Sequence, residues 1–98
     1  MKLRLTPEAI ADIDEAHDWY LSASHRVADR FVDAIDNALA STLQQPKAYR
    51  RVHRNLRRIL VSGFPYAIFF IDTDTEITVY GCFHGARDPR TWQRRVDA

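Results

Sequence analysis

The chain of 98 residues has little of several residue types, and each scarcity excludes a class of protein. Its single cysteine, Cys82, cannot form an internal disulfide, which excludes a disulfide-stabilised scaffold and favours a cytoplasmic setting. No apolar run has the length of a secretion signal or of a bilayer-spanning helix, so we expect no membrane partner. The three glycines form no phosphate-binding loop, and no histidine, cysteine and acidic residues have metal-ligand spacing. We therefore expect neither a cofactor nor a metal.

The charges that are present are unevenly distributed. Residues 1–46 carry four Lys/Arg and eight Asp/Glu, a net charge of −4, whereas residues 47–98 carry ten and five, a net charge of +5. A basic second half favours an anionic partner, either a nucleic acid or an acidic protein segment. The alternative is that the two halves neutralise each other within the fold. The length and the lack of internal repeats predict a single domain over residues 1–98.

The pattern of polar and apolar residues predicts an α+β fold. An N-terminal strand is followed by two helices, capped by Thr6 and by Ser22 or Ser24, which form an antiparallel hairpin. The hairpin is expected to pack on a small, mostly antiparallel sheet, and a short C-terminal helix follows that sheet. The expected elements are a strand at 2–5, helices from 7 and from about 25, strands at about 56–62, 64–71 and 76–84, and a helix from Pro89.

The helices and the last strand are each expected to have one solvent-exposed face. Acidic residues of the first helix, Asp12 among them, are placed mainly opposite its apolar stripe. In the strand, two sets of side chains alternate. Ile77, Val79, Gly81 and Phe83 are expected to meet the helices, and Thr78, Tyr80, Cys82 and His84 are expected to face a wetter surface.

Motifs spread along nearly the whole chain point to a known family. Residues 80–92 join a buried strand to a helix through a glycine turn. The motifs are Ala9, Asp12, Ile13, Trp19 and Tyr20; Ala28 and Phe31; Leu43 and Pro46; Leu56, Arg57 and Arg58; Phe64, Pro65 and Tyr66; and His84, Gly85, Arg87, Asp88 and Pro89. In their order and spacing the chain resembles the ParE/RelE superfamily, the toxins of bacterial type II toxin–antitoxin modules, and most closely its ParE-like branch.

The resemblance implies the fold described above and one of two activities. RelE-like members are ribosome-dependent mRNA endonucleases that use basic residues and a late tyrosine in a cleft on the sheet. ParE-like members poison DNA gyrase and do not need that catalytic set. Members of both kinds are neutralised by an antitoxin whose C-terminal segment wraps the toxin. A shared fold does not choose between the two activities.

The residues needed for RNA cleavage are only partly present. Cleavage requires a base near the 2′-hydroxyl, an acid for the leaving oxygen and cations on the phosphate. The candidates are Arg58, Tyr80, His84 and Arg87, with His84 as acid or base and Tyr80 as a weaker proton donor. No tyrosine follows Arg87, however, and arginine is a poor base. We therefore assign no catalytic residue. Instead of acting as acid or base, His84 could form a hydrogen bond to the backbone of the turn.

The remaining candidates are binding residues. Trp19 and Tyr20 lie late in the first helix. One of them can join the core and the other is expected near the rim, where it would be a natural antitoxin contact. Core packing is the more frequent fate of such residues. The residues expected to bind an anion or the target are Arg50, Arg51, Arg54, Arg57, Arg58, Arg87 and Arg90.

The sequence therefore predicts a growth-inhibiting toxin that acts by protein binding rather than by catalysis. The leading target is DNA gyrase or another topoisomerase, and the expected partner is a ParD-like antitoxin. Two hypotheses compete with this one. The first is a ribosome-dependent mRNA endonuclease of the RelE type, with the ribosome and mRNA as partners. The second is an inactive toxin-fold protein that survives as a partner of its antitoxin.

Overall fold

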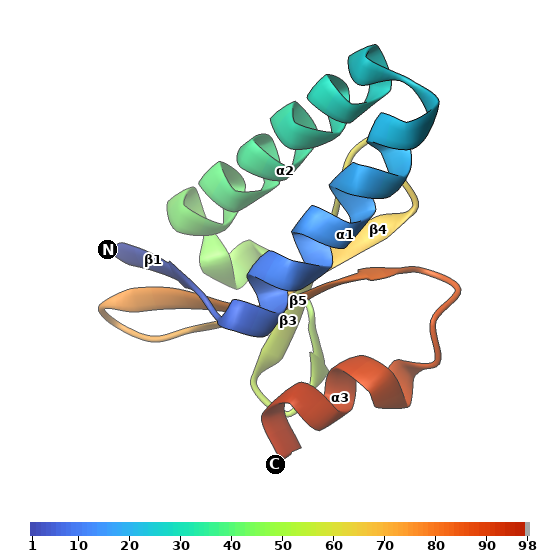
Figure 1. Cartoon of the computed structure of the whole chain (residues 1–98). Helices are drawn as coiled ribbons and strands as arrows, with labels where there is room; N and C mark the ends of the chain where they lie inside the picture. The colour runs from blue at the N-terminus through green and yellow to red at the C-terminus, as the bar shows by residue number, and fades with distance from the viewer. Residues whose placement is uncertain (98) are drawn as a thin grey trace.

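The computed structural model describes residues 1–97, which form a helical hairpin, a five-stranded sheet and a C-terminal helix (Figure 1). The predicted α+β fold, with its hairpin packed on a mostly antiparallel sheet, is confirmed. In chain order the elements are β1 (Lys2–Leu5), α1 (Pro7–Ala23), α2 (His25–Gln44), the 3₁₀ turn η1 (Pro46–Ala48), β2 (Arg51–His53), β3 (Leu56–Leu60), β4 (Tyr66–Asp72), β5 (Glu76–His84) and α3 (Pro89–Asp97).

Side-chain caps fix where the three α-helices begin. The backbone N–H of Ala9 donates to Thr6 Oγ1 at 3.1 Å at the start of α1, and that of Val27 donates to Ser24 Oγ at 3.3 Å at the start of α2. Of the two serines considered for the second cap, Ser24 is therefore the one used. The backbone N–H of Arg90 donates to Asp88 Oδ1 at 2.9 Å at the start of α3. Each cap satisfies a backbone donor that has no partner within its helix.

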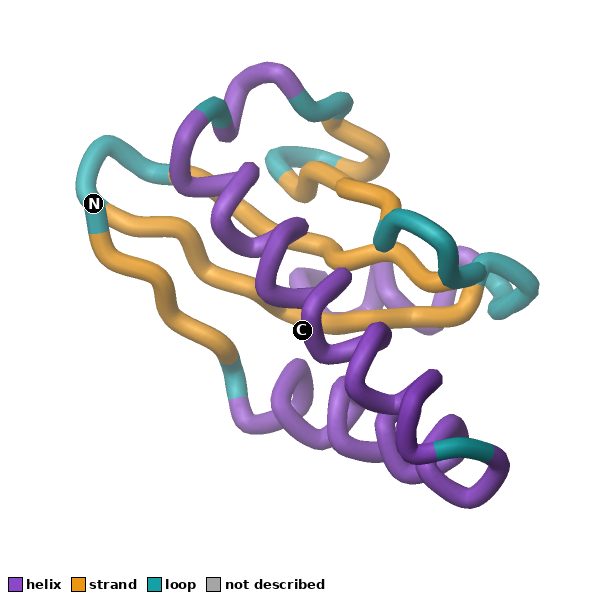
Figure 2. Tube along the Cα trace, turned by 90° about the horizontal axis from the view of Figure 1, so that it is seen from above, coloured by secondary structure: helices purple, strands orange, loops and turns teal. Residues whose placement is uncertain are grey.

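The sheet has the strand order β1-β5-β4-β3-β2, and only the β1–β5 pair is parallel. The hairpin of α1 and α2 covers one face of the sheet, and α3 lies against the other (Figure 2). β1 pairs with β5 only from Lys2↔Glu76 to Leu5↔Val79. Within residues 1–97, the end of β5 beyond Val79 therefore has a neighbouring strand on one side only, and α1 passes along the other side.

Two apolar cores lie on the two faces of the sheet. The hairpin-side core includes Phe31 of α2 together with Ile68 and Phe70 of β4, all fully buried or nearly so. The α3-side core is smaller and joins Leu56, Ala67, Phe69, Phe83 and Trp92. The Phe69 and Trp92 rings stack with their centroids 4.5 Å apart. Burial of this tryptophan is what holds α3, whose other side chains are mostly polar, against the sheet.

A β-bulge changes the predicted faces of β5. Phe69 pairs with Gly81 and Phe70 with Val79, so Tyr80 is an additional residue in β5. Before the bulge the prediction holds, since Ile77 and Val79 join the hairpin-side core. After the bulge the faces exchange: Cys82 belongs to the hairpin-side core and Phe83 to the α3-side core. The face of β5 opposite the hairpin is also less exposed to solvent than predicted, because α3 covers it.

The remaining differences from the predicted elements are small. β3 ends at Leu60 and β4 begins at Tyr66, because a turn with Gly63 at φ 83° and a bond from Phe64 N–H to the Val61 carbonyl (3.2 Å) separates them. β2 and η1 lie in the basic stretch, for which no element was predicted. No helix among residues 1–97 is both long and apolar enough to span a membrane.

Candidate functional site

An apolar cleft with a cationic rim opens beside α3. It has a volume of about 600 Å³ and lies between the turn that joins β3 to β4, the loop that joins β5 to α3, and α3 itself. The aromatic side chains of Phe69, Phe83 and Trp92 form part of its wall. The predicted residues Arg58, His84 and Arg87 also line it, so the fold brings these three side chains to one place.

His84 is held by the turn that follows β5. Its Nδ1 accepts a hydrogen bond from the backbone N–H of Ala86 at 3.0 Å, and its ring meets the edge of Tyr66 at 5.3 Å between centroids. Because Nδ1 is the acceptor, the neutral imidazole carries its proton on Nε2. The free nitrogen of the neutral ring is therefore a hydrogen-bond donor, which suits anion or carbonyl binding and does not suit a general base. The bond to the turn backbone is the alternative role that the sequence suggested.

The cleft does not include the fourth nuclease candidate, Tyr80. This residue is partly buried and packs against the α3-side core, as do Val52, Ile71 and Val96. Its carbonyl oxygen accepts a bond from Arg95 Nη1 at 2.8 Å. Tyr80 is absent from the residues that line the cleft, so the phenol is not placed beside Arg58 and His84. The cleft therefore combines two guanidinium groups and an imidazole without a second proton-transfer group from this set.

The predicted anion-binding arginines have different environments. Arg58 and Arg87 are exposed, and so are Arg50 and Arg51. Arg54 is also exposed and pairs with Asp97 at 2.9 Å. Arg90 pairs with Asp88 of its own helix cap at 2.6 Å, and that ion pair lowers the pKa of Asp88. The residues that remain available at the cleft are therefore Arg58 and Arg87.

Arg57 was expected to bind an anion, but the structure places it inside the fold. Its Nε donates to Asp72 Oδ1 at 2.7 Å and its Nη1 donates to the Tyr49 carbonyl at 2.8 Å. Both side chains of the ion pair are about nine-tenths buried. The strand pleat explains the difference, because Arg57 points toward the hairpin while its neighbour Arg58 points to the other face. Arg57 holds β3 to β4 and does not reach a partner.

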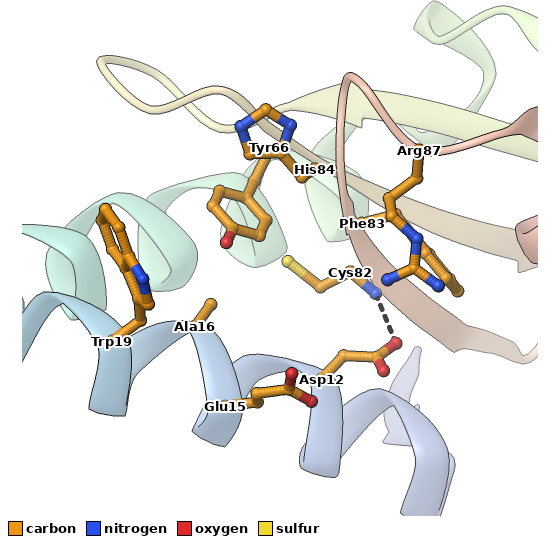
Figure 3. A pocket seen from close by; sticks show the side chains of 9 residues that line it. All are labelled: Asp12, Glu15, Ala16, Trp19, Tyr66, Cys82, Phe83, His84 and Arg87. Atoms are coloured by element: carbon orange, nitrogen blue, oxygen red, sulfur yellow. Dashed lines mark hydrogen bonds between the residues drawn. The ribbon is translucent and has the colours of Figure 1, made fainter.

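A smaller pocket of about 150 Å³ lies between α1 and the end of β5 (Figure 3). Asp12 was expected on the wet side of α1, but its carboxylate points into the structure here. Its Oδ2 accepts the backbone N–H of Cys82 at 3.0 Å, and both oxygens accept from the guanidinium of Arg95 at 3.1 Å. Asp12 thereby satisfies a backbone donor on the side of β5 that has no strand beyond Val79. No local sequence pattern predicts this contact, since Asp12 and Arg95 are 83 positions apart.

The same pocket shows that Cys82 is not a nucleophile. Burial, together with the negative charge of Asp12, raises the pKa of this thiol to about 12. The thiol is therefore neutral at physiological pH, and only a thiolate would be reactive. Among residues 1–97 no group of three His, Cys, Asp or Glu side chains is arranged to hold a metal ion.

The two aromatic residues at the end of α1 separate as expected. Tyr20 packs in an aromatic cluster with Phe31 and Phe64, at centroid distances of 5.2 and 5.1 Å. Trp19 is 66% exposed and lines the smaller pocket, where Figure 3 shows its indole standing across from Tyr66 and His84. Large aromatic side chains exposed at the edge of a pocket are frequent anchors in protein interfaces. Trp19 is the one of the pair that is accessible to a partner.

Comparison with known proteins gives a consistent result. Residues 3–89 match the family described as "ParE toxin of type II toxin-antitoxin system, parDE". The chain is 26% identical over 99 aligned positions to "Toxin ParE2" from two strains of Mycobacterium tuberculosis, an alignment that covers 97% of this chain and 91% of the relative. A solved structure titled "Chromosomal ParDE TA system from P. aeruginosa" is similar in fold, with a TM-score of 0.75 at 20% identity over 86% of this chain and 95% of the other. Since the family match spans most of its length, the chain belongs to the ParE toxins of type II toxin–antitoxin systems.

Proposed function

We propose that this toxin inhibits growth by binding a DNA topoisomerase, with DNA gyrase as the first target, and that a ParD-like antitoxin neutralises it. The observation that carries the proposal is the composition of the cleft. Two exposed guanidinium groups, Arg58 and Arg87, flank aromatic walls, and the His84 ring offers a donor at Nε2. Apolar walls with a polar, charged rim are typical of protein interfaces.

The occupant of this cleft is proposed to be an acidic, partly apolar surface of the topoisomerase. Arginine binds carboxylates in pairs of parallel hydrogen bonds and stays charged at every physiological pH. The exposed arginines of the β2 edge, Arg50, Arg51 and Arg54, would add to the attraction over a longer range. On this proposal the cleft binds the target and has no catalytic role. The toxin acts in the cytoplasm, where the target is located.

Trp19 is proposed as a contact of the antitoxin. The side chain is exposed at the rim of the pocket between α1 and β5, and it rests edge-on against Tyr20 at 5.2 Å. An anchored indole of this kind loses little conformational entropy when a partner covers it. A substitution of Trp19 should therefore weaken antitoxin binding more than it weakens the fold.

One observation favours a second function, that of a ribosome-dependent mRNA endonuclease. Arg58, His84 and Arg87 line the same cleft, which is where phosphate-binding cations and a titrating group would have to meet. The position of Tyr80 outside the cleft and the bond at His84 Nδ1 weigh against this function.

Induction of the toxin without antitoxin decides between these functions. The expected result is growth arrest with a DNA-damage response and intact mRNA, together with loss of gyrase supercoiling by purified toxin. Arg87→Ala should weaken the inhibition, and Arg26→Ala, an exposed change on α2, is the matched control. Cleaved mRNA without DNA damage would overturn the proposal in favour of the endonuclease. Absence of growth arrest would favour the remaining hypothesis, that the chain is an inactive toxin-fold partner of its antitoxin.

A further inference from the structure

One edge of the sheet is only partly covered by its outermost strand. β2 comprises only Arg51–His53, and the bond furthest along β3 runs from the backbone N–H of Arg58 to the Arg50 carbonyl at 3.2 Å. The chain before Arg50 forms the turn η1 rather than a strand, whereas β3 continues to Leu60. Within residues 1–97 the end of β3 therefore has a neighbouring strand, β4, on one side only.

The backbone groups of Leu60 point to the open side. The N–H of Val61 donates to the Tyr66 carbonyl at 2.9 Å, so Val61 and Tyr66 form a hydrogen-bonded pair between β3 and β4. Bonded and non-bonded pairs alternate in an antiparallel ladder, and the next pair is Leu60 with Ala67. The N–H and the carbonyl of Leu60 therefore point away from β4. Among residues 1–97 no backbone hydrogen bond outside the regular strand ladders involves Leu60 or the Arg58 carbonyl.

The Leu60 side chain is exposed beside the same edge. It is 71% exposed, more than any other large apolar side chain among residues 1–97. Arg58 and Leu60 alternate with the buried Ile59, so both lie on the α3 face of the sheet, where both line the cleft. Natural proteins usually protect open strand edges, because an exposed edge with apolar side chains pairs readily with another chain. A chain that pairs with this edge reaches the cleft with its own side chains.

The charge around the edge selects among possible partners. Residues 47–71 contain no Asp or Glu, and Arg50, Arg51 and Arg58 are exposed on or beside β2 and β3. A second copy of this chain, paired edge to edge, would place these arginines near one another, and like charges on paired strands are destabilising. Acidic side chains in the incoming strand would instead form ion pairs with the arginines. The edge therefore favours an acidic partner over a second copy.

We propose that the edge of β3 at residues 58–60 binds an extended acidic segment of the target topoisomerase as an additional antiparallel strand. Antiparallel pairing lets one residue of the segment exchange both hydrogen bonds with Leu60. On the cleft face an apolar side chain of the segment meets Leu60, and an acidic side chain two positions away meets Arg58. The inference rests on the proposed function, which assigns the adjoining cleft to the same target, and it adds the conformation and the sequence pattern of the bound segment.

A short synthetic peptide tests the pairing directly. Valine stands at its centre, with glutamate two positions away on either side and threonine at all other positions. Titration of isotope-labelled toxin with this peptide, followed by NMR, should shift the amide signals of Arg58, Ile59 and Leu60. A peptide with lysine in place of glutamate should bind at least about tenfold more weakly. Equal binding of the two peptides, or binding of neither, would overturn the proposal.

Methylation of single peptide nitrogens distinguishes strand pairing from other modes of binding. In the proposed pairing the N–H of the central valine faces Leu60, whereas the N–H groups of the adjacent threonines face away. N-methylation of the valine should weaken binding at least about tenfold, and N-methylation of an adjacent threonine should change it by no more than about twofold. Equal effects of the two modifications would overturn the strand pairing.

Two substitutions at one position make the same comparison in the toxin. Leu60→Pro removes the N–H that would pair with the segment and no bond to β4, and proline is tolerated at such an edge position. Leu60→Ala shortens the side chain but keeps the N–H, so it is the matched control. Leu60→Pro should weaken the glutamate peptide at least about threefold more than Leu60→Ala does. Equal affinities of the two variants would overturn the pairing, and the methylated peptides decide the question if circular dichroism shows that Leu60→Pro does not fold.

The supercoiling assay and the toxin–antitoxin complex identify the occupant. Leu60→Pro should inhibit gyrase less than Leu60→Ala does, and the complex with antitoxin should still bind the glutamate peptide. A complex that no longer binds the peptide would assign the edge to the antitoxin. A toxin dimer in analytical ultracentrifugation that Leu60→Pro disrupts would assign the edge to a second copy, and either result would overturn the assignment to the target.

The peptide measurements do not depend on toxicity. If purified toxin does not inhibit gyrase, the topoisomerase proposal fails, and binding of the glutamate peptide still shows that the edge accepts an acidic strand. If gyrase is inhibited and the peptide does not bind, only the strand pairing fails.

Discussion

At the scale of single residues, Arg57 and Arg58 are neighbours whose side chains lie in opposite environments. Arg58 is exposed on the α3 face of β3 and lines the cleft. Arg57 is buried on the hairpin face, where it bonds to Asp72 and to the Tyr49 carbonyl. A buried ion pair contributes little net stability when intact, but the loss of one partner leaves an unpaired buried charge. The two residues therefore allow a comparison between a structural arginine and an arginine that is proposed to bind the target.

Arg57→Met should lower the free energy of unfolding by about 3–5 kcal/mol, because the carboxylate of Asp72 would remain buried without its partner. Arg58→Met is the matched control and should change stability by no more than about 0.5 kcal/mol. Urea unfolding followed by circular dichroism measures both. The double variant Arg57→Met with Asp72→Leu should recover most of the loss. Equal stability of the two single variants would contradict the structural role of Arg57.

Asp72 should also make stability depend on pH. Burial raises the pKa of this carboxyl, but the hydrogen bond and the charge of Arg57 outweigh burial and hold the pKa below its ordinary value. A group with a lowered folded-state pKa stabilises the protein above its unfolded pKa, about 3.9 for aspartate, and loses that contribution as the pH falls. Acid titration of unfolding should therefore show a steeper loss of stability below about pH 4 in the wild type than in Asp72→Asn. Identical slopes would contradict the prediction.

These residue contacts mark where prediction from the sequence stops. Helical spacing predicts that one of Trp19 and Tyr20 is exposed, and residue type predicts a cap at Thr6 and at Ser22 or Ser24. The structure selects Trp19 as the exposed residue and Ser24 as the cap. The role of Asp12 depends instead on a contact with Arg95 across 83 positions, and the sequence contains no local pattern for such a contact. Arg57 and Arg58 likewise cannot be distinguished from the sequence alone, because the pleat of β3 decides on which face of the sheet each side chain lies.

At the scale of elements, the bulge in β5 decides which side chains reach which core. Gly81 lies at the bulge, and a Cβ atom built there would come within 2.5 Å of Phe83 Cε1 and 3.2 Å of Arg95 Nη1. The Phe83 ring is buried, so it has little room to move away. A bulge depends on how two strands align, and a single strand read in isolation predicts unbroken alternation. The faces of Cys82 and Phe83 could therefore not be predicted, although the strand itself could.

Gly81→Ala should destabilise the protein by about 1–3 kcal/mol, because the new methyl group overpacks the site between Phe83 and Arg95. Gly85→Ala is the control, since the nearest atom to its Cβ is the Pro65 carbonyl oxygen at 3.7 Å, an ordinary contact. Thermal unfolding of the two variants measures the difference. If Gly85→Ala were the more damaging change, the packing around the bulge would not be as described.

The attachment of α3 is a second property of elements. Only Trp92 is buried in this helix, and Arg95 ties it to α1 through Asp12 and to β5 through the Tyr80 carbonyl. The guanidinium also lies over the Phe83 ring at 4.7 Å. A short helix with one buried side chain depends strongly on such polar contacts.

Arg95→Ala should therefore loosen α3 without unfolding the hairpin and the sheet. Hydrogen exchange of the α3 amides should become several-fold faster, while exchange in β4 stays slow. Arg94→Ala, which removes an exposed arginine from the neighbouring position, is the matched control and should leave α3 exchange unchanged. Uniform acceleration over the whole chain would instead mean that Arg95 stabilises the fold globally.

At the scale of the whole molecule, the acidic and the basic residues lie mainly on different surfaces. The hairpin carries all eight acidic residues of the first half, and the exposed arginines of the second half lie on or beside β2, on β3, after β5 and in α3. The alternative that the two halves neutralise each other is partly confirmed by the ion pair of Arg95 with Asp12, whereas a difference in partner preference stays a prediction. Arg95 and Asp12 join the halves, whereas Arg58, Arg87, Asp14 and Asp36 remain at separate surfaces. Net charge from the sequence cannot distinguish paired from unpaired groups.

The separation of the two surfaces predicts that toxicity and neutralisation can be lost independently. Trp19→Ala removes the proposed antitoxin contact and leaves the cleft intact, so this toxin should still arrest growth but should be rescued less well by co-expressed antitoxin. Arg58→Ala with Arg87→Ala should do the reverse, since it removes the cleft cations and should abolish growth arrest while the antitoxin still co-purifies with the toxin. Growth curves and co-purification from the same cultures measure both properties. A variant pair in which both properties always fail together, despite normal circular dichroism, would mean that target and antitoxin compete for one surface.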